Sequence, residues 1–291
     1  MTLLGARLSI GPLGLRRPLR AACAAVAVLS SLALLACVTK SIERVAAPSR
    51  PPRAATLQEV LSAYDSYCAG LETFSASGDL DVKDLRAGKQ RKLSARVLAT
   101  RGGHLYIKGT VVLVTALEVV SNGERFWFQV PSKKTVWTGP TEATAAVEGA
   151  EQEPYYALRP RDVNAGLLPE PLAPGDGAML SLEGDAGSFC LTLSAVGGAP
   201  GQATVRRRVC LERETLRPSG LRSYDEHGNL TAEMSLADVR DGAAHRVVIS
   251  RPAEGYVVAF AFQKVARNQP VPEHAFSPRT PEGYAVIEVG K

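Results

Sequence analysis

The stretch that decides the fold class is residues 121–139, which read SNGERFWFQVPSKKTVWTG. Asn122-Gly123 lies between two apolar runs, and this dipeptide is among the stronger signals of a tight β-hairpin in a single sequence. Apolar and polar residues then alternate over 125–130, as they do in a strand with one buried face. Residues 134–139 follow after a short turn and pair naturally with that strand. The stretch therefore predicts antiparallel strands joined by tight turns.

The same alternation and the same kind of turn recur on both sides of this stretch. Short apolar segments with turn residues every eight to twelve positions are typical of antiparallel barrels and strongly curved sheets. We therefore predict a mainly β chain with a few helices and about 10–11 strands. The segments with this pattern are 74–82, 92–100, 104–109, 111–120, 125–130, 134–139, 178–183, 188–193, 205–214, 221–225, 230–236, 245–250, 256–264 and 284–289.

Two segments have the spacing of helices instead. Thr56 can cap a helix that ends near Gly70, and its apolar residues recur every three or four positions. These residues are Leu57, Val60, Leu61, Tyr64, Tyr67 and Cys68. Residues 157–168 (ALRPRDVNAGLL) are expected to form a second, short helix within a loop rich in Ala, Glu, Gly and Pro.

Residues 1–36 have the pattern of a secretory signal peptide. A basic run at 16–20 precedes an apolar segment that ends in LLAC, residues 34–37. This ending resembles the lipobox of bacterial lipoproteins, which implies cleavage between Ala36 and Cys37 and diacylation of Cys37. The apolar segment is shorter than the roughly 20 residues that span a bilayer as a helix. The alternative is an uncleaved anchor helix, and both interpretations predict an exported, membrane-tethered protein.

The remaining chain is predicted to hold a lipidated cysteine with a flexible Pro-rich tether (37–55) and a single β domain (56–291). Four of the 34 basic residues lie in the leader, which leaves 30 basic against 29 acidic residues. The basic character of the whole chain therefore belongs to the targeting segment. Without a net positive charge on the mature protein, we expect no nucleic acid partner.

Cysteines 190 and 210 are candidates for a disulfide. If the hairpin around 197–201 (GGAPG) is symmetric about Pro200, the two cysteines face each other across neighbouring strands. Directly opposed residues of an antiparallel pair come close enough for a disulfide. The alternatives are two reduced core cysteines, or a register that is off by one residue and separates them. Cys68 is expected to be a small core residue.

No catalytic, metal or cofactor site is predicted. The four histidines are scattered, and none has a second His, Cys or carboxylate at the spacing of metal ligands. The chain has no Gly-x-Ser-x-Gly elbow, phosphate-binding loop or dinucleotide fingerprint. We therefore expect a protein that is not an enzyme.

The pattern as a whole resembles the Lol family of lipoprotein carriers and receptors (LolA/LolB-like). Residues 121–139, 158–168 and 262–281 carry the resemblance, as a strand pair, a short helix and a closing strand with its exit. The resemblance implies an incomplete antiparallel β-barrel with an apolar concave face and a helical lid. The candidate residues for an acyl-chain cavity are Leu57, Leu61, Tyr64, Phe126, Phe128 and Val130, with Val111, Leu113, Val119 and Val120 adding bulk nearby.

This resemblance implies a membrane-anchored lipoprotein that binds or accepts acyl chains of lipids or lipoproteins. Val38, rather than Asp, follows Cys37, which by resemblance to lipoprotein sorting favours the outer membrane, with the domain facing the periplasm. The alternative is a non-enzymatic structural subunit of an envelope assembly with a filled core and envelope proteins as partners. A continuous apolar cavity favours the first hypothesis, and a close-packed interior favours the second.

Overall fold

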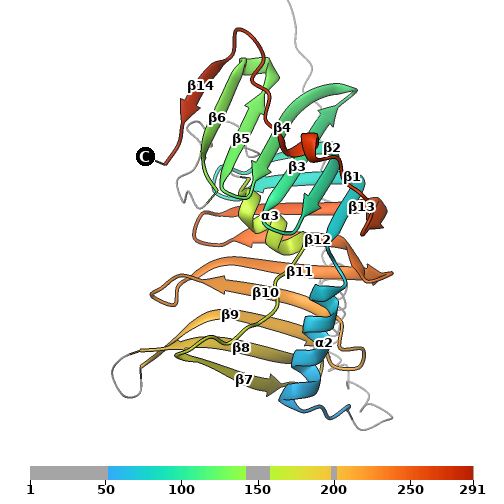
Figure 1. Ribbon diagram of the computed structural model, residues 1–291, viewed down its shortest axis with the longest axis vertical. Coiled ribbons are helices and arrows are strands. Elements are labelled where there is room, and N and C mark those ends of the chain that lie inside the picture. Colours follow the sequence, from blue (N-terminus) through green and yellow to red (C-terminus); the bar gives the residue numbers. More distant parts are fainter. Residues whose placement is uncertain (1–51, 142–157, 198–201, 291) are drawn as a thin grey trace, which may run out of the picture. The chain divides into compact units, whose positions relative to one another are not determined.

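A computed structural model describes residues 52–141, 158–197 and 202–290, and in these residues one sheet of 14 strands dominates (Figure 1). Its strands are β1 (Thr73–Asp84), β2 (Lys89–Thr100), β3 (His104–Val111), β4 (Val114–Asn122), β5 (Arg125–Val130), β6 (Thr135–Pro140), β7 (Ala178–Gly184), β8 (Ser188–Val196), β9 (Ala203–Glu212), β10 (Pro218–Tyr224), β11 (Leu230–Arg240), β12 (Ala243–Arg251), β13 (Tyr256–Arg267) and β14 (Ala285–Glu288). Two 3₁₀ turns, η1 (Pro131–Lys133) and η3 (Glu273–Phe276), and two α-helices complete the described elements.

The sheet is open and almost wholly antiparallel. Its order is β14-β6-β5-β4-β3-β2-β1-β13-β12-β11-β10-β9-β8-β7, and only β14 pairs in parallel, with β6. The two end strands are edges, so the sheet does not close into a barrel. The predicted count of about 10–11 strands was too low, because every alternating segment in the sequence forms a separate strand.

One predicted segment has a different structure from the one expected. The apolar run 111–120 is not a single strand, because β3 ends at Val111 and β4 begins at Val114. The chain reverses at Val112-Leu113, and both residues have positive φ angles, of 45° and 69°. Two central residues with positive φ are the mark of a type I′ hairpin turn, for which Asn-Gly is the preferred sequence. The run contains no such dipeptide, so the turn was missed.

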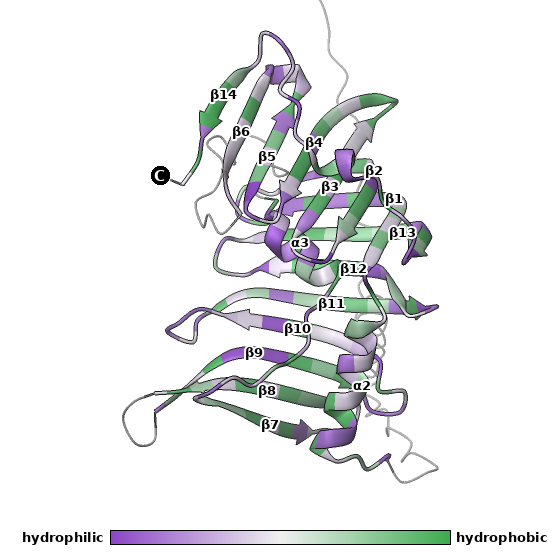
Figure 2. Ribbon diagram, in the orientation of Figure 1, coloured by the Kyte–Doolittle hydropathy of each residue, from purple (hydrophilic) through white to green (hydrophobic). Residues whose placement is uncertain are grey.

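Alternating burial gives the sheet one apolar face, here called the inner face. In β1 the buried residues alternate with more exposed ones, and Leu80 lies opposite Leu93 of β2 and Phe260 of β13. Phe260 in turn lies opposite Val247 of β12. Figure 2 shows the matching alternation of hydrophilic and hydrophobic bands along the strands. Since side chains on successive residues point to opposite faces, each strand contributes one row to a continuous core.

The helices α2 (Leu57–Ala69) and α3 (Pro160–Leu167) cover parts of the inner face. In Figure 1, α2 crosses the strands near β8, and α3 lies over β12 and β3, which are among the strands that it contacts. Thr56 caps α2 as predicted and forms a capping box with Glu59. In the ranges that the structure describes, no helix is long and apolar enough to span a membrane.

Candidate functional site

The three predicted site residues of β5 lie on the inner face. Phe126, Phe128 and Val130 are buried, while the residues between them are partly exposed. Phe128 packs edge-on against Trp137 of β6, with ring centroids 6.2 Å apart. These three residues therefore share the buried face of β5.

The predicted residues of α2 divide into two groups. Tyr64 is fully buried, and its hydroxyl donates to the carbonyl oxygen of Glu170 at 2.9 Å. Burial raises the pKa of Tyr64 well above its ordinary value, so the phenol is neutral. Leu57 and Leu61 are half-buried and pack against the same core. The fully buried stripe of α2 is Val60, Tyr64 and Cys68.

The structure therefore brings Tyr64, Phe126, Phe128 and Val130 into one core cluster, to which Leu57 and Leu61 add partly buried surface. Val119 and Val120 are also buried. The expectation for Val111 and Leu113 is wrong: these residues point into solvent at the β3–β4 turn instead of adding bulk to the interior.

Polar contacts attach the helical cover to the sheet. Arg101, which follows β2, donates to the carbonyl oxygen of Cys68 at the end of α2, and to that of Pro169 at 3.4 Å. Asn164 of α3 donates to the carbonyl oxygen of His104 at 3.0 Å. These contacts join the cover to the β2–β3 hairpin through side chains that are far apart in the sequence.

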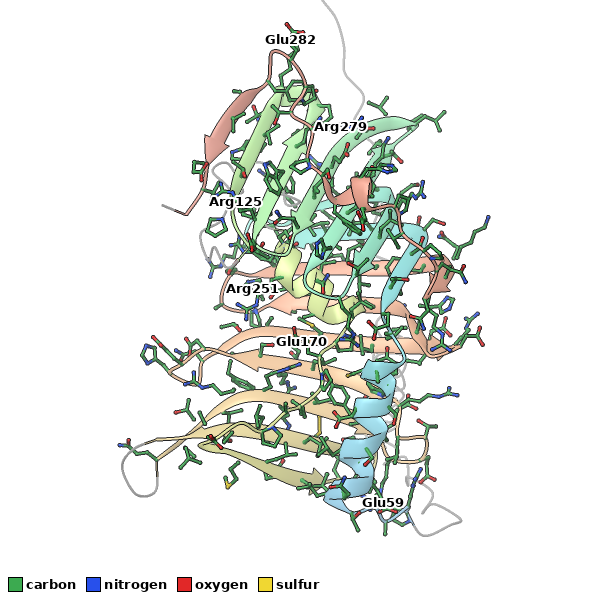
Figure 3. All side chains as sticks on the ribbon, in the orientation of Figure 1. Glu59, Arg125, Glu170, Arg251, Arg279 and Glu282 are labelled. Carbon is green, nitrogen blue, oxygen red and sulfur yellow. A yellow bond between two sulfur atoms is a disulfide. The ribbon has the colours of Figure 1, made fainter. Side chains whose placement is uncertain are left out.

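A second group of polar contacts joins α3 to the β12–β13 hairpin. Arg251 bonds Asp162 of α3 at 2.6 Å and Glu254 at 2.8 Å, and Arg159 reaches Glu254 at 3.3 Å. Figure 3 labels Arg251 beside α3. Burial opposes the charge of Arg251, but the two carboxylates outweigh it and raise the pKa of its guanidinium.

This ion-pair network could not be found from the sequence. Arg251 and Asp162 are separated by 89 positions, and neither lies in a recognisable motif. Burial also raises the pKa of the neighbouring Tyr256 phenol well above its ordinary value. Because the pairs are largely buried, removing one partner would leave the other charge poorly solvated.

The most unusual surface feature is the β3–β4 turn with its flanking residues, Val111, Val112, Leu113 and Val114, here called the hairpin tip. The exposed fractions of these four residues are 47%, 89%, 98% and 70%. Four consecutive large apolar side chains in water are rare at a hairpin turn, where polar turn residues are usual. The left-handed backbone at a Val and a Leu adds a further cost, of about 1–2 kcal/mol for each residue.

Cys190 and Cys210 form a disulfide and lie directly opposite each other in β8 and β9. Simple symmetry about Pro200 is not the whole reason for this pairing. The pairing expected from symmetry about Pro200 holds as far as the pair Leu193–Arg207. Nearer the loop the pairing is displaced by one residue, because a bulge lies between Leu193 and Ser194. Without this bulge the two cysteines would miss each other by one position. A stable disulfide is typical of proteins in an oxidising compartment.

The predicted cleavage and lipidation site, Ala36 and Cys37, lies outside the described residues. Free Cys68 is buried in the core, where burial raises the pKa of its thiol to about 11. Among the residues that the structure describes, no three His, Cys, Asp or Glu side chains converge in the manner of metal ligands.

No protein-family model matches this sequence, and no curated protein matches it. Solved structures do resemble the chain. A domain described as outer-membrane lipoprotein-sorting, from Vibrio parahaemolyticus, is 13% identical over 76% of this chain and 97% of its own, with a TM-score of 0.49. A LolA superfamily protein from Nitrosomonas europaea is 11% identical over 77% of this chain and 99% of its own, with a TM-score of 0.47.

A DUF1329 family protein from Desulfovibrio piger is 14% identical over 77% of this chain and 98% of its own, with a TM-score of 0.49. The resemblance to the Lol family that the sequence indicated is thus present among the structural neighbours. Identities this low and TM-scores below 0.5 assign no function to this chain.

Proposed function

We propose that this protein is an exported, membrane-tethered binding protein that accepts acyl chains of lipids or lipoproteins at a membrane surface. The observation that carries the proposal is the hairpin tip. Its apolar side chains are exposed to water on a strained turn, so the isolated domain gains nothing from them. Inserted among lipid tails, a Val or Leu side chain gains about 1.5–3 kcal/mol from leaving water. The hairpin tip is therefore proposed to enter the bilayer.

The inner face under α2 and α3 is the proposed acyl-chain site. An acyl chain would have to replace the buried stripe of α2, which consists of only three side chains. Exposing these side chains costs roughly 5–8 kcal/mol, whereas burying about twelve CH₂ groups yields roughly 10 kcal/mol. The free energy of exchanging the helix side chains for an acyl chain is therefore close to zero, as is required of a protein that both takes up and releases lipid. The exchange needs no catalytic residue.

The proposal includes the anchor and its compartment. Lipidation of Cys37 would hold the domain at the outer membrane, facing the periplasm, through the tether 37–55. The disulfide between Cys190 and Cys210 supports an oxidising compartment outside the cytoplasm. A tethered domain meets the bilayer at high local concentration, so a short apolar tip is sufficient for repeated contact.

One observation favours the alternative function, a structural subunit of an envelope assembly. The candidate cavity residues are packed in one core cluster with the helices, as expected for a filled interior. In that case the hairpin tip would contact a protein partner instead of lipid, and the interior would take up no acyl chain.

The test uses the unit from Pro52 onward, which contains the whole described sheet and lacks the anchor. Native mass spectrometry with a lipid extract and an acylated peptide should detect bound acyl species, and Leu61→Glu should reduce them. Leu61 is only half-buried, so this variant should still fold. Arg125→Gln, on an exposed surface pair with Glu288, is the control. A folded protein that takes up no acyl species would contradict the proposal and favour the structural subunit.

A further inference from the structure

A hollow of about 440 Å³ lies beside the C-terminal half of α2, between the helix and the turns β9–β10 and β11–β12. Three arginines line it, Arg53, Arg217 and Arg267, and no Asp or Glu is among its lining residues. Outside the predicted leader the chain has 30 basic and 29 acidic residues, so three cations with no carboxylate in the same lining give a locally positive potential.

Backbone contacts position two of the three guanidinium groups. Arg53 donates through Nη1 to the carbonyl oxygen of Glu214 at 3.0 Å, and Arg217 donates through Nη1 to that of Val239 at 3.2 Å. A guanidinium has five N–H donors, so each of these groups keeps most of its donors for another acceptor.

Arg267 lies directly over the β11–β12 turn. A Cβ atom added to Gly242 would clash with its guanidinium, so the Arg267 side chain would have to shift to admit another residue there. Of the carboxylates outside the lining, Glu72 pairs with Arg101 and Asp238 pairs with Arg240. Hydrogen bonds from Thr56 lower the pKa of Glu59 most, and Glu59 lies near enough to Arg53 for that charge to lower it further. Within the described ranges, none of the three arginines of the hollow forms an ion pair with a carboxylate.

The floor of the hollow is apolar. Leu216 and Pro218 are buried, and Tyr67 is half-buried. Leu216 has a φ of 52°, an unfavourable left-handed conformation for a leucine, and such strain is found more often at binding sites than elsewhere. Arg267 acts against the rise in the pKa of Tyr67 that burial causes, which indicates that the guanidinium is close to the phenol ring.

We propose that this hollow binds a phosphate ester, with the phosphate among Arg53, Arg217 and Arg267 and the organic part over the floor. Guanidinium groups bind phosphate oxygens through paired N–H donors, and several around one site are the usual arrangement for this anion. The volume exceeds that of a bare ion and lies in the range of small-molecule sites. The inference is independent of the hairpin tip and of acyl-chain binding.

The phosphate could belong to a lipid headgroup or to a soluble ester, so the experiment has two arms. The full chain is held in a nonionic detergent and titrated with inorganic pyrophosphate, or with short-chain phosphatidylglycerol against short-chain phosphatidylcholine. Binding is followed by isothermal titration calorimetry. Phosphatidylcholine carries a phosphate as well as a cation, so a site for net anionic headgroups should prefer phosphatidylglycerol.

The test variant is Arg53→Gln/Arg217→Gln/Arg267→Gln, and the matched control is Arg125→Gln, an exposed arginine that pairs with Glu288 and does not line the hollow. We expect saturable binding of at least one probe, at least tenfold weaker in the triple variant and unchanged in the control. Binding of pyrophosphate without binding of phosphatidylglycerol favours a soluble ester, and binding of phosphatidylglycerol, with or without pyrophosphate, favours a headgroup.

The triple lysine variant keeps the charges but lacks the paired donors, so it should bind with intermediate affinity. It also serves as the test if the glutamine variant fails to fold. Equal binding by the wild type and either folded variant, or no saturable binding of either probe by the wild type, would overturn the proposal.

Discussion

Replacing Val112-Leu113 with Asn-Gly is expected to stabilise the domain and, at the same time, to weaken its binding to lipid vesicles. Asn and Gly tolerate the left-handed conformation that the β3–β4 turn imposes, whereas Val and Leu do not. The two native side chains are 89% and 98% exposed, so the domain loses almost no buried apolar surface when they are removed.

The expected gain in stability follows from the cost of the present turn. Each left-handed non-glycine residue costs about 1–2 kcal/mol, and the substitution removes this cost. The greater conformational freedom of Gly in the unfolded chain offsets about 1 kcal/mol of the gain in stability. The net gain is therefore about 2 kcal/mol. For a domain of this size, that corresponds to a rise in Tm of roughly 4–8 °C.

The expected loss in vesicle binding comes from the same two side chains. Moving a Val and a Leu from water into lipid contributes about 3–6 kcal/mol, and 1.4 kcal/mol is a factor of ten. The partition coefficient of the unit from Pro52 onward should thus fall at least about a hundredfold. Flotation with phosphatidylcholine vesicles measures the partition, and calorimetry measures Tm. Val286→Asn, at another exposed apolar position, is the control.

The prediction fixes the direction of change in both Tm and vesicle binding, so either measurement can contradict it. If Asn-Gly raises Tm but leaves vesicle binding unchanged, the hairpin tip does not insert and the membrane role fails. If Tm falls, the turn is not strained in the way the backbone angles indicate.

Three further predictions concern the fold. Replacing both Cys190 and Cys210 with Ala should cost about 3 kcal/mol, because the disulfide closes a loop of 20 residues, and urea unfolding should show an equal loss when the wild type is reduced. Cys68 should react with a thiol reagent only as the protein unfolds, since its thiol is buried with a pKa of about 11; fast labelling of the native protein at neutral pH would refute this. Gly78→Ala should destabilise the domain by at least about 2 kcal/mol, because its Cβ would lie 2.1 Å from the carbonyl oxygen of Ala261, and an unchanged Tm would show that the bulge between β1 and β13 moves freely.

Much of the fold could be predicted because the signals are local. Alternation with a period of two located the strand segments, and Asn122-Gly123 located the β4–β5 turn. The capping box at Thr56 and the stop at Gly70 located α2, because a cap depends on residues within one turn of the helix end. Phe126, Phe128 and Val130 could be assigned to one face because side chains in a strand alternate.

Other features depended on tertiary structure. The turn at Val112-Leu113 carries no turn residues, and pairing of the flanking strands holds it in an unfavourable conformation against local preference. The disulfide between Cys190 and Cys210 was predicted correctly by counting from Pro200, but the bulge in β9 that gives this register could not be found by that count. Asp162 meets Arg251 only because α3 lies across β12.

The sequence by itself thus determined where the strands and α2 form and which side chains of a strand share a face, because these properties depend on neighbours within a few residues. The tertiary structure decided that the sheet stays open, that the apolar tip faces solvent, and that three arginines surround one hollow. Each of these features depends on segments that are far apart in the chain. Local propensity does not determine how such segments pack against one another, so only the tertiary structure places them.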